Sequence, residues 1–318
     1  MTRNPILALL AIVLLGLQVA GCTKHEDPVP PEPQAAQQEP QAAHAMATGN
    51  SVASLAGDGA EIHFKVYGSG QPTVVFVHGW SCDSRYWDAQ LDAFAAQYTV
   101  VTLDLAGHGQ STRGARKDWS IAEYGADVAA VVEAIGAPRV VLIGHSLGGP
   151  VSLDAARRLP GKVIGLVGVD TFQDIVTPFP SAELDEFLKP FRADFASATR
   201  AFVGDNFFTA ASDPVIRQWI IDDMSQAPPE VAIPSLVGLV QMDQRAAVTE
   251  LDLPIVAINS DKYPTPEEEI RRVEPRFRVV RMAGVGHFVM MEDPWTFNSL
   301  LQEVVSTWAG LDARRLSQ

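Results

Sequence analysis

The sequence predicts an α/β fold, in which a mostly parallel central sheet is covered by helices on both faces and carries an inserted helical cap. Three observations predict it. From Ala60 onward, short runs of β-branched and aliphatic residues alternate with helical stretches. A buried strand leads through a glycine-rich turn into a helix at 140–159. Between Asp170 and Leu253 the alternation stops, and helix signals occur without a convincing strand pair. Such a pattern is typical of a sheet with a helical insertion.

Each element follows from its own local pattern. Apolar runs that end in loops predict strands within 61–70, 72–80, 98–111, 139–144, 162–170, 253–261 and 276–287. Helical spacing and capping residues predict helices within 85–97, 122–136, 148–159 and 293–310. The inserted cap is expected at about 171–250, with helices within 182–195, 215–224 and 228–242. The folded domain is expected to span 51–318.

Composition excludes several kinds of partner. The chain has 318 residues and a formal net charge of −14, which argues against binding to nucleic acid or to an anionic surface. It has 2 cysteines and no spacing typical of a metal site, so neither a disulfide framework nor a metal is expected. No cofactor is expected either. Cys82 is expected to be a small buried thiol.

The N-terminus has the pattern of an export signal. Arg3 precedes an apolar run that ends in Val-Ala-Gly-Cys at 19–22, and this ending resembles the lipobox of bacterial lipoproteins. The resemblance implies a signal peptide at 1–21, lipidation of Cys22, and a cell-envelope protein that faces the periplasm, at the outer membrane rather than the inner because Thr23 follows. An uncleaved anchor helix and an ordinary secreted protein are the alternatives. Residues 22–50, rich in Pro, Gln and Ala, predict a disordered tether.

The turn after the fourth predicted strand has the composition of a nucleophile elbow. Gly144-His145-Ser146-Leu147-Gly148 is a G-x-S-x-G sequence between a strand and a helix. The glycines permit a sharp turn that lifts the serine hydroxyl above the sheet, and the Leu147 N–H then lies at the positive end of the helix. We therefore predict that Ser146 is a nucleophile and that the Leu147 N–H contributes to an oxyanion hole.

A serine nucleophile needs a base and a group that orients the base. His287 follows a strand and precedes the last helix, so it is the expected base. Asp261 ends the strand before it and is the expected acid, with Asp170, at the end of an earlier strand, as the alternative. The Trp80 N–H, after a buried strand near the start of the domain, is the expected second oxyanion donor. His78 is expected to hold that loop, and His108 to serve a turn.

These motifs together resemble the α/β-hydrolase superfamily, in particular its serine hydrolases with a helical cap. The matching segments lie within about 58–310: "FVHGW", "DLAGHGQS", "GHSLGG", "NSD" and "GVGHFVMMEDPWTFN". The resemblance implies a carboxylesterase-like enzyme. It leaves open a lactonase, a carbon–carbon bond hydrolase and a cofactor-free perhydrolase or haloperoxidase on the same triad. A non-catalytic envelope binding protein is a further alternative, but it predicts a missing triad residue, and none is missing.

The cap is rich in aromatic residues. Trp219 and Met224 lie in it. So do eight of the 14 phenylalanines: Phe172, Phe179, Phe187, Phe191, Phe195, Phe202, Phe207 and Phe208. A small helical cap must build its own core, yet a few helices cannot hide so many rings, so some are expected to face the gap above Ser146. This predicts a preference for small, uncharged, apolar esters.

Overall fold

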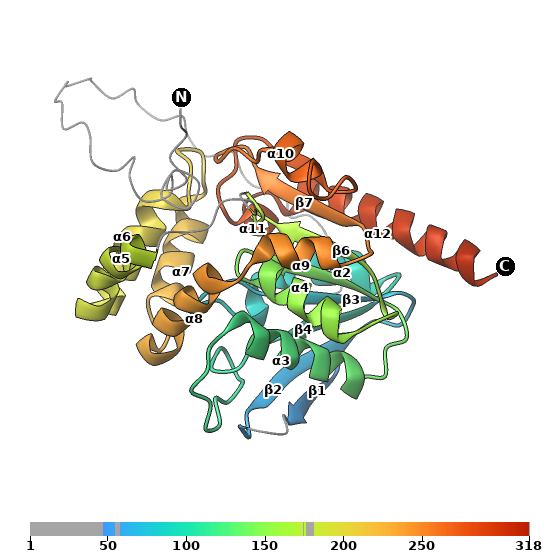
Figure 1. Ribbon diagram of the computed structural model, residues 1–318, viewed down its shortest axis with the longest axis horizontal. Coiled ribbons are helices and arrows are strands. Elements are labelled where there is room, and N and C mark those ends of the chain that lie inside the picture. The colour runs from blue at the N-terminus through green and yellow to red at the C-terminus, as the bar shows by residue number, and fades with distance from the viewer. Residues whose placement is uncertain (1–46, 55–57, 174, 176–180, 318) are drawn as a thin grey trace, which may run out of the picture.

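The computed structural model describes residues 47–54, 58–173, 175 and 181–317 (Figure 1). Its centre is an eight-stranded sheet with the strand order β1-β2-β4-β3-β5-β6-β7-β8. β2 runs antiparallel to both of its neighbours, and every other neighbouring pair is parallel. The predicted mostly parallel sheet is therefore confirmed. The strands are β1 (Ala47–Ser54), β2 (Glu61–Tyr67), β3 (Thr73–Val77), β4 (Thr99–Leu103), β5 (Val140–His145), β6 (Val163–Val169), β7 (Ile255–Ser260) and β8 (Arg278–Met282).

The middle strands are buried along their whole length. Every residue of β3, β5 and β7 is buried, which agrees with their continuous runs of Val, Ile and Leu. The register of β5 with β6 pairs Gly144 with Gly168 and His145 with Val169. The carboxyl ends of these two strands therefore lie side by side, and the residues that follow them are neighbours.

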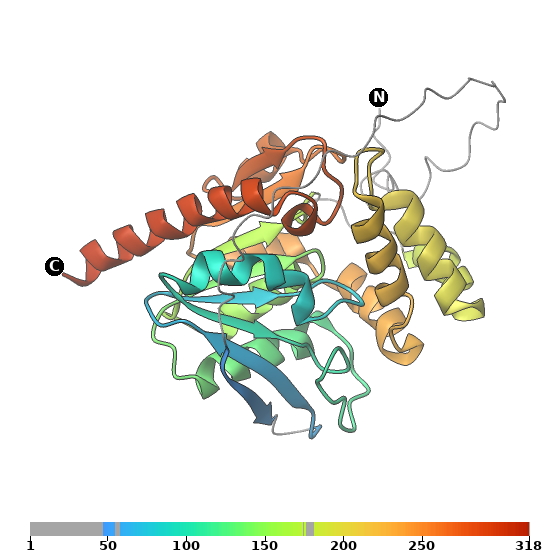
Figure 2. The ribbon, with the colours of Figure 1, turned by 180° about the vertical axis from the view of Figure 1, so that it is seen from behind.

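Helices cover both faces of the sheet, as Figures 1 and 2 show from opposite sides. One face carries α3, α4 and α9, and the other carries α2 and α12. The structure also has three short helical segments outside the cap, η2, α10 and α11. The bounds are η2 (Ser84–Trp87), α2 (Asp88–Ala95), α3 (Ile121–Ala134), α4 (Gly148–Arg158), α9 (Gln244–Glu250), α10 (Glu267–Arg271), α11 (Val289–Glu292) and α12 (Pro294–Leu316).

The inserted helices lie between β6 and β7, as the interrupted alternation predicts. Figure 1 shows them beyond one edge of the sheet, at the left of the view. Asp213 caps α7 through the amides of Val215 and Ile216, and α5 continues through Pro190. The last helix of the interval, α9, packs on α4 of the sheet layer, so the cap proper is α5 (Ser181–Ala193), α6 (Phe195–Asn206), α7 (Pro214–Met224) and α8 (Pro229–Gln241).

The N-terminal boundary differs from the expected one. β1 begins at Ala47, inside the range 22–50 expected to be a tether, because residues 47–54 pair with β2. The expected signal peptide at 1–21 and the lipidation site Cys22 lie outside the described residues. Within the described part of the chain, no helix has the length and hydropathy needed to cross a membrane.

Candidate active site

The turn between β5 and α4 has the geometry of the predicted elbow. Ser146 lies between the end of β5 and the start of α4, with φ of 51°, a left-handed value that is strained for a residue with a side chain. A Cβ at Gly144 would lie 2.1 Å from the Gly148 carbonyl oxygen, and one at Gly148 would lie 2.4 Å from the Val77 carbonyl oxygen. Both positions require glycine because backbone occupies the space of a side chain. The Ser146 side chain itself is only partly covered.

Leu147 directly precedes α4 and is 1% exposed. The first amides of a helix have no carbonyl partner within the helix, and they point toward its positive end. The Leu147 N–H therefore lies at the positive end of α4, directly after Ser146.

His287 and Asp170 form a buried pair. The His287 Nδ1 lies 2.6 Å from the Asp170 Oδ2, and the two side chains are 8% and 1% exposed. The other carboxylate oxygen, Oδ1, accepts a hydrogen bond of 2.8 Å from the Ser260 amide. Asp170 follows β6 with φ of 43°, and this left-handed turn directs its carboxylate across the end of β7. The carboxylate is thus held by two donors and orients the imidazole.

Asp261 is not the orienting acid, so this part of the prediction is wrong. Its side chain is exposed, and its Oδ1 accepts a hydrogen bond of 3.0 Å from the Gly284 amide. Its own amide donates to the Met282 carbonyl oxygen, which continues the pairing of β7 with β8. The alternative acid, Asp170, occupies the position that we had expected for Asp261.

The backbone of His287 is fixed on both sides. Its N–H donates to the Phe207 carbonyl oxygen at 2.7 Å, and its carbonyl oxygen accepts from the His145 Nε2 at 3.0 Å. The His145 and Phe207 rings also pack on the imidazole, with centroid distances of 4.6 and 4.4 Å. His145, which precedes Ser146, and Phe207, in the inserted segment, therefore hold His287 directly. Neither contact is visible in the sequence pattern, because both join segments far apart in the chain.

His145 is uncharged. It is fully buried, and burial lowers the pKa of its imidazole well below the usual value. Because its Nε2 bonds a carbonyl oxygen, that nitrogen carries the proton. The Nδ1 then has no hydrogen-bond partner among the described residues, and it faces Gly79, where a Cβ would lie 2.8 Å from it.

The loop after β3 holds Trp80 against the cap. The His78 Nε2 accepts a hydrogen bond from the Leu105 amide at 3.0 Å, so the Nδ1 carries the proton and donates to the Gly79 carbonyl oxygen at 2.8 Å. The predicted role of His78 in holding this loop is confirmed. The Trp80 indole Nε1 donates to the carbonyl oxygen of Ala232, on α8, at 2.7 Å. The expected oxyanion loop is thus bonded to the loop after β4 through the His78 side chain and to the cap through the Trp80 side chain.

Cap phenylalanines reach both the base and the oxyanion loop. The Trp80 ring packs edge-on against three of them, with centroid distances of 5.9 to 6.3 Å: Phe191, Phe195 and Phe202. Phe207 packs on His287, and Phe202 joins Phe207 to the same cluster at 5.1 Å. Phe172 instead packs on Phe277, and a Cβ at Gly168 would lie 2.5 Å from its ring, so it belongs to the sheet core. The rings therefore pack on one another within the cap and contact Trp80 and His287.

Two further side chains with reactive groups, Cys82 and His108, are buried. Burial raises the pKa of the Cys82 thiol well above its usual value, and the thiol donates to the Trp80 carbonyl oxygen. Burial lowers the pKa of His108 to about 3, and its Nδ1 contacts the Ala106 carbonyl oxygen, in agreement with a turn role. No group of three potential metal ligands occurs among the residues that the structure describes.

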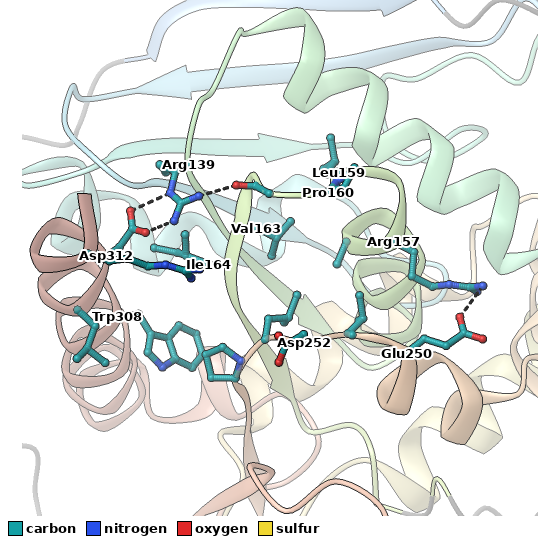
Figure 3. A pocket seen from close by; sticks show the side chains of 17 residues that line it. Arg139, Arg157, Leu159, Pro160, Val163, Ile164, Glu250, Asp252, Trp308 and Asp312 are labelled. Carbon is teal, nitrogen blue, oxygen red and sulfur yellow. Dashed lines mark hydrogen bonds and ion pairs between the residues drawn. The ribbon is translucent and has the colours of Figure 1, made fainter. Parts of the chain in front are cut away.

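A pocket of about 680 Å³ lies at the amino ends of the strands, near the starts of β5, β6 and β7 (Figure 3). Arg139 and Asp312 form an ion pair on one side of it, and Arg157 and Glu250 on the other. Four of its six charged lining groups are thus paired with one another. None of the predicted catalytic residues contributes to this pocket.

The comparisons with known proteins agree with the fold. The sequence model of the family described as "alpha/beta hydrolase fold" matches residues 72–232. The biotin biosynthesis bifunctional protein BioHC of Cellvibrio japonicus is 28% identical over 78% of this chain, which spans half of that protein. A non-heme haloperoxidase of Rhodococcus erythropolis is 45% identical over 34% of this chain and 39% of its own length.

Solved structures extend the similarity over most of the chain. A thermophilic esterase from Thermogutta terrifontis has a TM-score of 0.72 at 21% identity, covering 82% of this chain and 100% of that one. An enol-lactonase from Burkholderia xenovorans has a TM-score of 0.67 at 20% identity, covering 78% and 98%. At these identities the likeness shows a shared fold.

Proposed function

We propose, from the premise that this chain belongs to the α/β-hydrolase fold family, that it is a serine hydrolase that cleaves small, apolar carboxylic esters. The observation that carries the proposal is the buried His287–Asp170 pair together with the strained turn at Ser146, whose N–H donates to the carbonyl oxygen of Val169, the residue before Asp170, at 3.0 Å. Such a turn is retained only where the surrounding structure enforces it, and such turns concentrate at active sites.

In the proposed reaction the Ser146 Oγ attacks the ester carbonyl carbon while its proton passes to the His287 Nε2. The Asp170 carboxylate holds the Nδ1–H and stabilises the imidazolium. The negative oxygen of the tetrahedral intermediate is bound by the N–H groups of Trp80 and Leu147. Collapse breaks the ester C–O bond, and the alcohol leaves with the proton from His287. Water then attacks the acyl-enzyme by the same steps and releases the acid.

The surroundings of the catalytic groups favour an apolar substrate. The rings of Trp80, Phe202 and Phe207 form one contiguous cluster beside His287. Each methylene that an acyl chain buries against such rings contributes about 0.8 kcal/mol, or roughly fourfold in kcat/KM. A charged acyl group would have to lose its water without gaining a partner charge.

Other reactions of the same triad are the second candidate. The similarity to a haloperoxidase and to an enol-lactonase favours lactone opening or peracid formation on Ser146. Carbon–carbon bond hydrolysis would also use the same residues. A panel of esters, lactones and diketones, with hydrogen peroxide as an alternative acyl acceptor, separates these activities.

The test of the triad compares single variants. Ser146→Ala is expected to abolish ester hydrolysis and labelling by a fluorophosphonate. Asp170→Asn is expected to lower kcat by about 10⁴-fold with little change in KM, because the amide holds the wrong imidazole tautomer. Asp261→Asn is the matched control and is expected to retain wild-type kcat. Equal losses in the two aspartate variants would contradict the assignment of Asp170.

For location, we propose that the protein is anchored in a bacterial cell envelope by a lipid on Cys22 and faces the periplasm, as the sequence ending Val-Ala-Gly-Cys suggests. Cys22→Ser is expected to release the protein from the membrane fraction or leave it unprocessed. A mature protein without mass beyond its peptide would contradict lipidation.

A further inference from the structure

We infer that Glu292 is a positioning residue for the catalytic base, and that through it the cap takes part in holding His287. The inference rests on the proposed function, in which His287 is the base. Glu292 does not contact the reacting atoms; it acts on the backbone of the loop that carries the imidazole.

The Glu292 carboxylate binds the amides on either side of His287. Its Oε2 accepts a hydrogen bond of 3.0 Å from the Gly286 N–H, and its Oε1 accepts one of 3.3 Å from the Phe288 N–H. Glu292 lies at the end of α11, so the chain returns to its own loop within six residues. An ionised acceptor makes both bonds stronger than neutral ones. The carboxylate therefore fixes the peptide planes that set the direction of the imidazole.

Gly286 leaves room for this arrangement. A Cβ at this position would lie 2.2 Å from the Phe207 carbonyl oxygen and 2.7 Å from the Glu292 Oε1. The loop thus approaches the cap and the carboxylate more closely than any other residue type allows.

The cap is bound to the same carboxylate and the same loop. The Ser212 hydroxyl, before α7, donates to the Glu292 Oε2. The carbonyl oxygens of residues 206–208, at the end of α6, each accept a hydrogen bond of 2.7 Å. The Tyr263 hydroxyl donates to residue 206, the His287 N–H to residue 207 and the Lys262 Nζ to residue 208. The end of α6 and the segment that follows it are therefore bonded both to the loop that carries His287 and to the loop after β7.

The contacts of Glu292 are expected to affect kcat and not KM. An imidazole displaced by about 1 Å lowers the rate by about 10²-fold, because proton transfer requires short hydrogen-bond contact. The contacts of Glu292 are made to two backbone amides of the loop and to the Ser212 hydroxyl, and none of these bonds involves the ring of Trp80, Phe202 or Phe207. Loss of these contacts is expected to lower kcat and to leave KM nearly unchanged.

The first test is Glu292→Gln, which keeps the volume and one acceptor oxygen but loses the second acceptor and the charge. We expect kcat to fall by about 10- to 100-fold while KM stays within about threefold. Glu303→Gln removes the same charge from an exposed position on α12 and is expected to retain wild-type kcat. In proton NMR, the signal of the His287 Nδ1–H, bonded to Asp170, is expected to broaden through faster exchange in Glu292→Gln only.

A second variant keeps the inference testable if Glu292→Gln fails to fold. Ser212→Ala removes only the cap hydroxyl and is expected to lower kcat by about threefold in the wild type and by much less in a Glu292→Gln background, because the two residues share one interaction. Thr307→Ala, at an exposed position on α12, is expected to have no effect in either background. Additive effects of Ser212→Ala and Glu292→Gln would contradict the coupling to the cap.

The inference and the proposed function fail in different ways. A wild-type protein that neither hydrolyses esters nor reacts with a fluorophosphonate overturns the proposed function. An active wild type whose kcat and Nδ1–H signal are unchanged by Glu292→Gln overturns the positioning role alone.

Discussion

The buried histidines make the stability of this protein depend on pH. Burial lowers the pKa of His108 to about 3 in the folded state, whereas an unfolded histidine has a pKa of about 6.5. The unfolded state therefore binds more protons between these values, so the free energy of unfolding falls as the pH is lowered below 6.5 and levels off near pH 3. Burial lowers the pKa values of His78 and His145 in the same direction.

The expected size follows from the two pKa values. Between pH 7 and pH 5, protonation of His108 in the unfolded state alone lowers the free energy of unfolding by about 2 kcal/mol. His108→Gln removes this contribution. The variant is expected to be less stable than the wild type at pH 7, because its ring contacts with His78 and Tyr124 are lost. The penalty is expected to be smaller by about 2 kcal/mol at pH 5.

The assay is urea unfolding at 25 °C, followed by tryptophan fluorescence at pH 7, 6 and 5. Carboxylates and the other histidines titrate in both proteins, so their contributions cancel in the difference between variant and wild type. Val132→Ala, a buried cavity variant on α3, is the control and is expected to lower stability equally at each pH. If His108→Gln loses as much stability on acidification as the wild type does, the account of His108 as a buried neutral histidine is wrong.

Three further predictions concern the site. Gly148→Ala is expected to lose activity and several kcal/mol of stability, because its Cβ would meet the Val77 carbonyl oxygen. Thermal unfolding measures the stability and ester hydrolysis the activity, and a stable, active variant would contradict this packing. Trp80→Phe removes the indole hydrogen bond to Ala232 and is expected to lower kcat/KM by about tenfold, with intact folding by circular dichroism; unchanged kinetics would show that the cap anchor is dispensable. Among p-nitrophenyl esters from acetate to octanoate, kcat/KM is expected to rise with chain length until the pocket is full and to be low for a charged succinate monoester; a preference for the charged ester would refute the apolar site.

The parts of the site that depend on local pattern could be predicted from the sequence. The strained turn at Ser146 requires the glycines that surround it, and these are visible within five residues. His287 is recognisable as a histidine after a late strand. The sheet and the inserted helices follow from alternating periodicity and its interruption.

The acid could not be chosen in this way. Asp170 and Asp261 both end buried strands, and the sequence contains nothing that determines the φ of 43° by which Asp170 turns toward the base. The same limit applies to Glu292, whose partners become visible only when the loop around His287 is folded back on it. The start of β1 was missed because residues 47–50 carry no strand pattern of their own and are ordered by pairing with β2.

The position of Asp170 also bears on how such a chain can change over evolutionary time. Ser146 and Asp170 follow two strands that pair in register, so their separation is determined within the sheet, and the whole insertion comes after both of them. Lengthening, shortening or exchanging the inserted helices therefore leaves the nucleophile and the acid undisturbed. The carbonyl groups of residues 206–208, the hydroxyl of Ser212 and the Ala232 carbonyl group bonded by Trp80 must return to the same places. The cap can thus diversify as a separate module, provided that these few attachment points are kept.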